Sequence, residues 1–129
     1  MITLEVGLVT SDAAQLVRFY EDGFGFVVAQ VLEFPQGSLH RLRRGDARIK
    51  IHQPIGGAES RGSIDPWYRY SGICYAALHV QDIQAEVAHS LDAGAVLMTP
   101  ITNHRPGAAF ALIADPDGNV WEILQETPL

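Results

Sequence analysis

The hydrophobic and polar positions follow the same arrangement in both halves of the chain. The segment LEVGLVTSDAAQLVRFYEDGFGF matches CYAALHVQDIQAEVAHSLDAGAV in pattern. In each segment an apolar strand ends near an aspartate, Asp12 or Asp82, and apolar residues at helical spacing follow until a glycine. A short side-chain oxygen accepts hydrogen bonds from the free N–H groups at a helix start. In each half, the aspartate or the residue before it is therefore expected to be the N-cap of the helix.

Turn sequences then divide each half into three further strands. The expected strands are 26–33, 38–44 and 47–53 in the first half and 95–100, 108–114 and 120–125 in the second. Segments 35–37, 45–46 and 115–119 have the composition of turns, and segment 55–71 that of a linker. The sequence therefore predicts an α+β domain, residues 1–129, made of two βαβββ modules at 1–54 and 72–127.

Alternation along the strands gives each module an apolar face and a mixed face. Side chains alternate between the two faces of a strand, so the apolar sets are expected to pack on the helices, which then lie outside. The mixed faces would line a cleft where the two mostly antiparallel sheets form a cup, and a few polar groups in a concave surface suit a small molecule. Exposure of these faces to solvent is the alternative. The ionisable candidates are Glu5, Lys50, His52, Tyr75, His79 and Glu122.

Composition excludes several classes of function. The chain is 47% hydrophobic with a formal net charge of -6, which favours a packed core and disfavours nucleic-acid binding. No apolar run is long enough to cross a bilayer, so we expect a cytoplasmic protein without membrane contact. The single cysteine, Cys74, excludes an intrachain disulfide and is interpreted as a packing residue.

Two motifs resemble those of the vicinal-oxygen-chelate superfamily, which contains glyoxalases, bleomycin-resistance proteins and extradiol dioxygenases. Asp115-Pro116-Asp117-Gly118-Asn119 resembles the D-P-D-G-N motif that opens the last strand in this family. Phe19-Tyr20, followed by Gly23-Phe24-Gly25-Phe26, is similar to the family's helix ending. The resemblance covers nearly the whole chain and implies two paired modules around a cupped sheet.

The resemblance also implies four ligand positions, on the first and last strand of each module. They fall on Glu5, Lys50, Tyr75 and Glu122 in this sequence. An ammonium group only donates hydrogen bonds and repels cations, so Lys50 is interpreted as replacing the metal and pairing with Glu5 and Glu122. We expect no cofactor. The alternative is a divalent ion (Zn, Ni, Fe, Mn or Mg) held by Glu5 and Glu122.

Other candidates rest on weaker patterns. His52 and His79 with Glu122 would match the ligand set of non-haem iron oxygenases, although their spacing does not match the family's positions. Trp67 in the linker would stack on a planar ligand, anchor the linker to the sheet or be buried at a dimer contact. Residues 102–107 are expected to form a loop, with a lid or a solvated loop as alternatives. Arg105 in this loop could contact an anionic group.

The sequence is compatible with two functions. The first is a metal-independent binding protein that holds a planar or apolar small molecule, as relatives do, in a homodimer. The second is an enzyme. A metal-dependent lyase, isomerase or dioxygenase would act on vicinal oxygens. A metal-free version would use Glu122 or Glu5 as general base, with Lys50 holding an oxyanion.

Overall fold

The computed structural model describes residues 1–62 and 66–127. Contacts between Cα atoms divide the chain into two compact units, Met1–Ser60 and Arg61–Leu129, which we call unit 1 and unit 2. The division falls within the predicted linker 55–71, of which residues 63–65 lie outside the described part. None of the described helices is long and apolar enough to cross a membrane.

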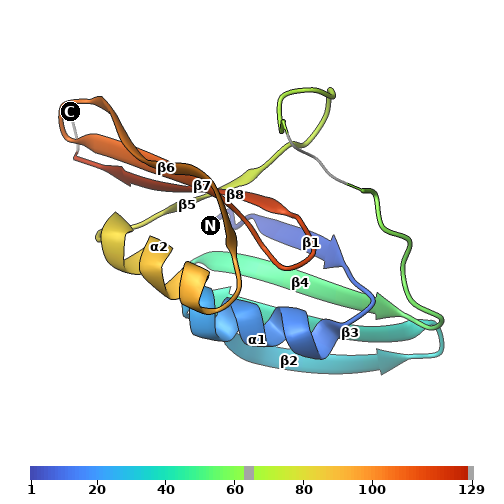
Figure 1. The fold of residues 1–129 in the computed structure, drawn as a ribbon. Helices are drawn as coiled ribbons and strands as arrows, with labels where there is room; N and C mark the ends of the chain where they lie inside the picture. Colours follow the sequence, from blue (N-terminus) through green and yellow to red (C-terminus); the bar gives the residue numbers. More distant parts are fainter. Residues whose placement is uncertain (63–65, 128–129) are drawn as a thin grey trace. The chain divides into compact units, whose positions relative to one another are not determined.

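Both units contain the predicted strand, helix and three strands (Figure 1). Unit 1 comprises β1 (Glu5–Val9), α1 (Ala13–Phe24), β2 (Val27–Phe34), β3 (Gly37–Arg44) and β4 (Ala47–Pro54). Unit 2 comprises β5 (Ala76–His79), α2 (Ile83–Asp92), β6 (Val96–Arg105), β7 (Ala108–Ala114) and β8 (Val120–Glu126). The α+β class and the βαβββ plan are therefore confirmed.

Each unit forms a four-stranded sheet with one parallel pair. The strand order is β1-β4-β3-β2 in unit 1 and β5-β8-β7-β6 in unit 2. The first strand of each unit runs parallel to the last, and the remaining pairs are antiparallel. The mostly antiparallel pairing expected from the short turns is thus present in both sheets.

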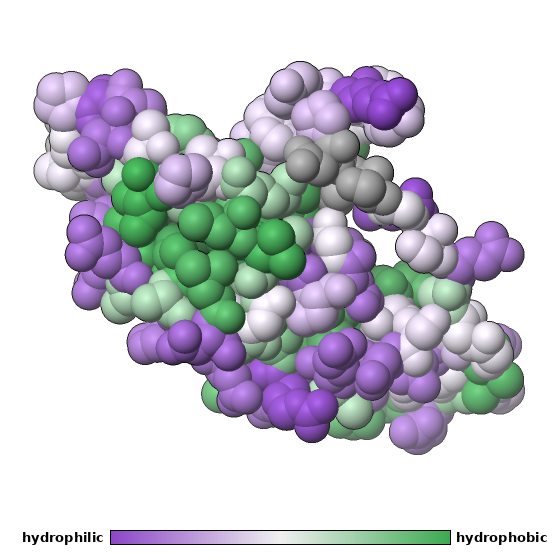
Figure 2. Space-filling model, in the orientation of Figure 1, coloured by the Kyte–Doolittle hydropathy of each residue, from purple (hydrophilic) through white to green (hydrophobic). Residues whose placement is uncertain are grey.

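The helices cover one face of each sheet and bury the apolar sets. In unit 1, α1 buries Leu16 and Tyr20, and the strands bury Leu42, Ile49 and Ile51. In unit 2, α2 contacts β6, β7 and β8, and Trp121 and Ile123 are buried. Large apolar side chains also remain exposed, several of them in the edge strands β2 and β6, and green areas reach the surface in Figure 2.

Both helices begin in the same way. The Asp12 carboxylate accepts a hydrogen bond from the Gln15 N–H at 3.0 Å, and the Asp82 carboxylate accepts one from the Ala85 N–H at 3.1 Å. Each aspartate satisfies a backbone donor that the helix itself leaves unpaired, which confirms both as N-caps. At the other end of α1, Gly25 adopts a left-handed backbone with φ of 67°, as a helix-ending glycine does.

A glutamine from the last strand completes each helix start. The Gln53 side-chain oxygen accepts a hydrogen bond from the Ala13 N–H at 2.7 Å, and the Gln125 side-chain oxygen accepts one from the Ile83 N–H at 2.8 Å. The two glutamines hold corresponding positions in β4 and β8, so the repeat extends to single hydrogen bonds. It therefore supplies an alignment of the two units that does not depend on turn sequences.

Two boundaries differ from the sequence prediction. Residues 102–105 belong to β6 and pair with β7, so the loop expected at 102–107 is wrong except for the turn at 106–107. The strand expected at 95–100 is consequently longer, because register shifts let β6 continue beside β7. Tyr75 lies just before β5 rather than within it.

Candidate functional site

The face of the unit 1 sheet opposite α1 carries the predicted polar residues. Strand register places Gly7 beside Lys50, and Glu5 beside Arg48, between β1 and β4. Between β3 and β4 it places Arg41 opposite Lys50. Because side chains at alternate positions share a face, these five residues lie on the side away from Ile49 and Ile51. We call this surface the Glu5 face.

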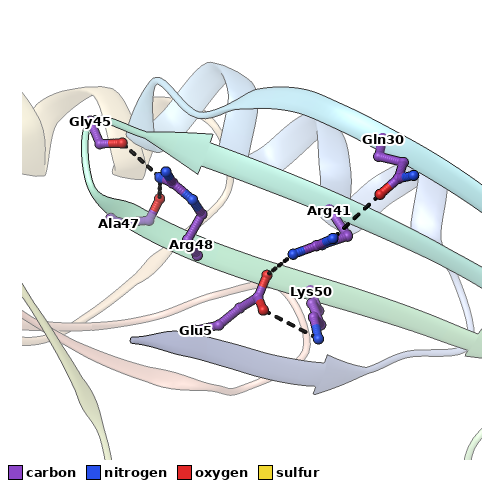
Figure 3. Close-up of polar contacts among 7 residues, drawn as sticks. All are labelled: Glu5, Gln30, Arg41, Gly45, Ala47, Arg48 and Lys50. Carbon is purple, nitrogen blue, oxygen red and sulfur yellow. Dashed lines mark hydrogen bonds and ion pairs between the residues drawn. The ribbon is translucent and has the colours of Figure 1, made fainter. Parts of the chain in front are cut away.

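Two cations hold the carboxylate of Glu5 (Figure 3). The Lys50 Nζ lies 3.2 Å from Glu5 Oε1, and the Arg41 Nη2 lies 3.3 Å from Glu5 Oε2. Arg41 also donates from Nη1 to the side-chain oxygen of Gln30 at 3.4 Å, which links β2 to the cluster. The three charged side chains are partly exposed, 43% for Arg41, 37% for Lys50 and 25% for Glu5.

The charges of these neighbours set the ionisation of Glu5. Partial burial acts to raise the pKa of its carboxyl group, but the hydrogen bond and charge of Lys50, with the charge and hydrogen bond of Arg41, outweigh it. The net result is a pKa below the usual value, because both cations favour the carboxylate form. Glu5 is therefore a weaker base than an ordinary glutamate.

This lowered pKa predicts a pH-dependent contribution to stability. A carboxyl group whose pKa is lower in the folded state stabilises the fold above its unfolded-state pKa, about 4.3, and loses that contribution as the pH falls through the folded-state value. Urea denaturation of wild type and Glu5→Gln should give a difference in unfolding free energy of under ~1 kcal/mol near neutral pH, since the pairs are partly exposed. The difference should shrink below about pH 4. A difference independent of pH would contradict the ion-pair assignment.

The repeat fixes which residues are equivalent between the units. Gly7 pairs with Lys50 in the parallel ladder β1/β4, and Ala77 pairs with Glu122 in the parallel ladder β5/β8. Gln53 lies three residues after Lys50, as Gln125 does after Glu122, and the two glutamines make the same hydrogen bond. Lys50 therefore stands in unit 1 where Glu122 stands in unit 2.

The donor set of the Glu5 face does not fit a divalent metal. Both carboxylate oxygens of Glu5 already face cationic groups, and the neighbouring Lys50 offers only donors. Within residues 1–62 and 66–127, no group of three His, Cys, Asp or Glu side chains that could hold a metal is present. A cation beside Glu5 would have to displace two positive side chains, which Coulomb repulsion opposes.

Unit 2 brings a different pair of predicted residues together. Arg105 Nη2 lies 2.9 Å from Glu126 Oε2, and His79 Nδ1 lies 3.8 Å from Glu126 Oε1. Glu126, which the sequence did not single out, therefore gathers both at the end of β8. Glu122 is half-buried on the same face of β8, with Ala77 and Leu112 as its register neighbours.

The aromatic candidates contact one another. The Trp67 ring lies edge-on to Tyr75, with centroids 5.3 Å apart and an interplanar angle of 87°. Tyr68 contacts Trp67 in a similar way at 5.5 Å. These ring contacts join Trp67 in the linker to Tyr75, the residue before β5. Cys74 lies in the same stretch, with its sulfur 3.2 Å from the Gly72 carbonyl oxygen. His52 is exposed on the Glu5 face.

Arg41, like Glu126, is a residue that the sequence analysis missed. It carries no motif, yet it holds one of the two oxygens of Glu5. The sequence does contain a signal for the position of Arg41. The two-residue turn at Gly45 and Asp46 joins β3 to β4 and sets Arg41 opposite Lys50. Counting back from that turn would have placed Arg41 on the same face as Lys50.

Comparison with known proteins identifies the family. The model of the Glyoxalase/Bleomycin resistance protein/Dioxygenase superfamily matches residues 3–123, and the chain belongs to this superfamily. An uncharacterized Mycobacterium bovis protein is 27% identical over 120 residues, which cover 92% of this chain and 79% of that protein.

Solved structures from Bacillus cereus and Zea mays share this fold. A glyoxalase family protein from Bacillus cereus has a TM-score of 0.84 at 14% identity, covering 99% of this chain and 96% of its own. Glyoxalase I from Zea mays has a TM-score of 0.81 at 16% identity, covering 98% of this chain and 45% of the maize chain. At these identities the likeness concerns the fold.

Proposed function

We propose that this protein binds a planar or apolar small molecule without a metal ion, through a site that includes the Glu5 face. The observation that carries the proposal is the occupation of both Glu5 oxygens by Lys50 and Arg41. Lys50 stands at the position equivalent to Glu122, so the ammonium replaces a carboxylate at one of the four positions where the family resemblance implies metal ligands. Membership of the superfamily supports ligand binding in general.

The same geometry bears on catalysis. Glu5 is a poor general base near neutral pH, because Lys50 and Arg41 lower its pKa. Glu122 stays the stronger candidate for a base, and Lys50 the candidate for holding an oxyanion, in a metal-free enzyme. We retain a cytoplasmic homodimer as part of the proposal. The competing function is a divalent-metal-dependent lyase, isomerase or dioxygenase.

Metal analysis separates the two functions. Protein purified without chelators should contain well below one equivalent of Zn, Ni, Fe, Mn or Mg by elemental analysis. It should also bind the neutral fluorescent probe N-phenylnaphthylamine with saturation at one site per chain. A stoichiometric divalent ion would overturn the metal-independent proposal, and absence of probe binding would overturn the apolar-ligand proposal.

A matched pair of variants tests the role of Lys50. Lys50→Glu restores a carboxylate at the position equivalent to Glu122 and removes the repelling ammonium, so it should take up more Mn²⁺ than wild type in equilibrium dialysis. Arg48→Glu makes the same charge change on the same face of β4, but its guanidinium contacts the Gly45 and Ala47 carbonyl oxygens rather than Glu5. Equal Mn²⁺ uptake by both variants would show that Lys50 does not occupy a metal position.

A further inference from the structure

The Glu5 face is strongly cationic in a chain that is acidic as a whole. Arg41, Arg43, Arg48 and Lys50 share this face by strand register, and Glu5 is the one carboxylate among its described strand positions. Its formal charge is therefore +3, against -6 for the whole chain. Like charges in opposed strand positions destabilise a sheet, so this concentration of cations does not favour the fold of unit 1.

Lys50 and Arg41 keep donors that Glu5 does not use. An ammonium group has three N–H donors and a guanidinium five, while the contacts to Glu5 and Gln30 are single and 3.2–3.4 Å long. Both side chains are also more than a third exposed. Arg48 differs, because it already donates to two backbone carbonyl oxygens at 2.7 and 3.1 Å. Lys50 and Arg41 thus keep available donors at opposed positions of β4 and β3.

Gly7 leaves open space beside Lys50. A Cβ built on Gly7 would meet no atom of the described residues within 4 Å, leaving aside its chain neighbours. Gly7 is also absent from the glycines with positive φ, so its backbone does not require glycine. Glycine weakens a strand interior and often marks a place where another group approaches closely. In unit 2 the corresponding position holds Ala77.

We propose that the bound molecule carries an organic anionic group, a carboxylate or sulfonate, which Lys50 and Arg41 bind over the open position at Gly7. This inference rests on the proposed function and names the class of its ligand. Glu5 acts as a positioning residue, because its carboxylate holds the two cations side by side and offsets part of their charge. Charge-assisted hydrogen bonds from Lys50 and Arg41 to the anion would be stronger than bonds between neutral groups.

The test compares two probes that differ in one anionic group. Anilinonaphthalene sulfonate joins an apolar aromatic body to one sulfonate group, and N-phenylnaphthylamine has the same aromatic body without the sulfonate. We expect wild type to bind the anionic probe at one site, at least about tenfold more tightly than the neutral probe. Lys50→Gln and Arg41→Gln should each weaken the anionic probe several-fold and leave the neutral probe unchanged.

Two further variants complete the test, one as a control away from the Glu5 face and one that fills the open position. Arg18→Gln removes one positive charge from the exposed side of α1 and should change neither affinity. Gly7→Val adds a side chain beside Lys50 and should weaken both probes, with no loss of stability in urea denaturation. Two results would overturn the anionic class of ligand and leave the proposed function standing. One is equal affinity of wild type for the two probes, and the other is an affinity for the anionic probe that Lys50→Gln and Arg41→Gln do not change. Binding of neither probe would overturn both.

Discussion

Replacing Asp115 with alanine is expected to lower the free energy of unfolding by about 3 kcal/mol or more. The Asp115 side chain is buried, and its Oδ1 accepts from the N–H groups of Asp117 at 3.0 Å and Asn119 at 2.9 Å. Its Oδ2 accepts from the Asn119 side-chain amide at 2.8 Å. Alanine would leave these donors without their acceptor in the turn that leads into β8.

The control for this prediction is Asp117→Ala in the same turn. Asp117 is exposed and contributes its backbone N–H, which alanine retains, so the change should stay within about 0.5 kcal/mol. Tryptophan fluorescence is a suitable probe, because Trp67 and Trp121 are the two tryptophans of the chain and both lie in unit 2. Equal midpoints in urea for the two variants would contradict the structural role of Asp115.

Gly37→Ala is expected to destabilise the protein by roughly 3 kcal/mol. Gly37 has a φ of 152°, and a Cβ there would overlap the Gln53 carbonyl oxygen and lie 2.9 Å from the Pro54 Cα. Backbone atoms of a paired strand cannot move aside without breaking the β3/β4 ladder. Gln53 also binds the first N–H of α1, so displacing it would disturb the helix start as well.

Gly45→Ala is the matched control for the steric part of this effect. Gly45 also has a positive φ, 56°, but a Cβ there would meet no described atom within 4 Å. Gly45→Ala should therefore lower the free energy of unfolding by about 1–2 kcal/mol, because alanine is strained in the left-handed backbone. Circular dichroism would follow both variants in urea. If Gly37→Ala is no more destabilising than Gly45→Ala, the overlap with Gln53 has no energetic consequence.

The Gly37→Ala variant also tests whether residues 1–129 unfold as one domain. Gly37 lies in unit 1, whereas both tryptophans lie in unit 2. In a single cooperative transition, Gly37→Ala should shift the tryptophan fluorescence midpoint as much as the circular dichroism midpoint. A shift seen by circular dichroism alone would contradict the single-domain prediction.

The D-P-D-G-N motif shows how sequence and structure complement each other. The sequence predicted a turn at residues 115–119 and linked it to a family, but it assigned no role to Asp115. The structure places this carboxylate as the acceptor for the turn's own donors. The most specific motif of the chain therefore stabilises the entry to β8, the strand that carries Glu122.

What the sequence determined by itself is the local and repeated part of this protein. Apolar spacing, the capping aspartates and the turn residues act within a few positions, so they predicted the order of elements and the face on which Glu5 and Lys50 lie. The two-residue turn even set Arg41 opposite Lys50, although no motif drew attention to it.

Only the tertiary structure decided which partners each polar side chain has. The pairing of Arg41 with Glu5 spans 36 residues, and the meeting of His79 and Arg105 on Glu126 joins three strands. The continuation of β6 through residues 102–105 depends on hydrogen bonds to β7 rather than on its own composition. Such contacts join side chains from strands that lie far apart in the sequence, so patterns that act within a few positions do not specify them.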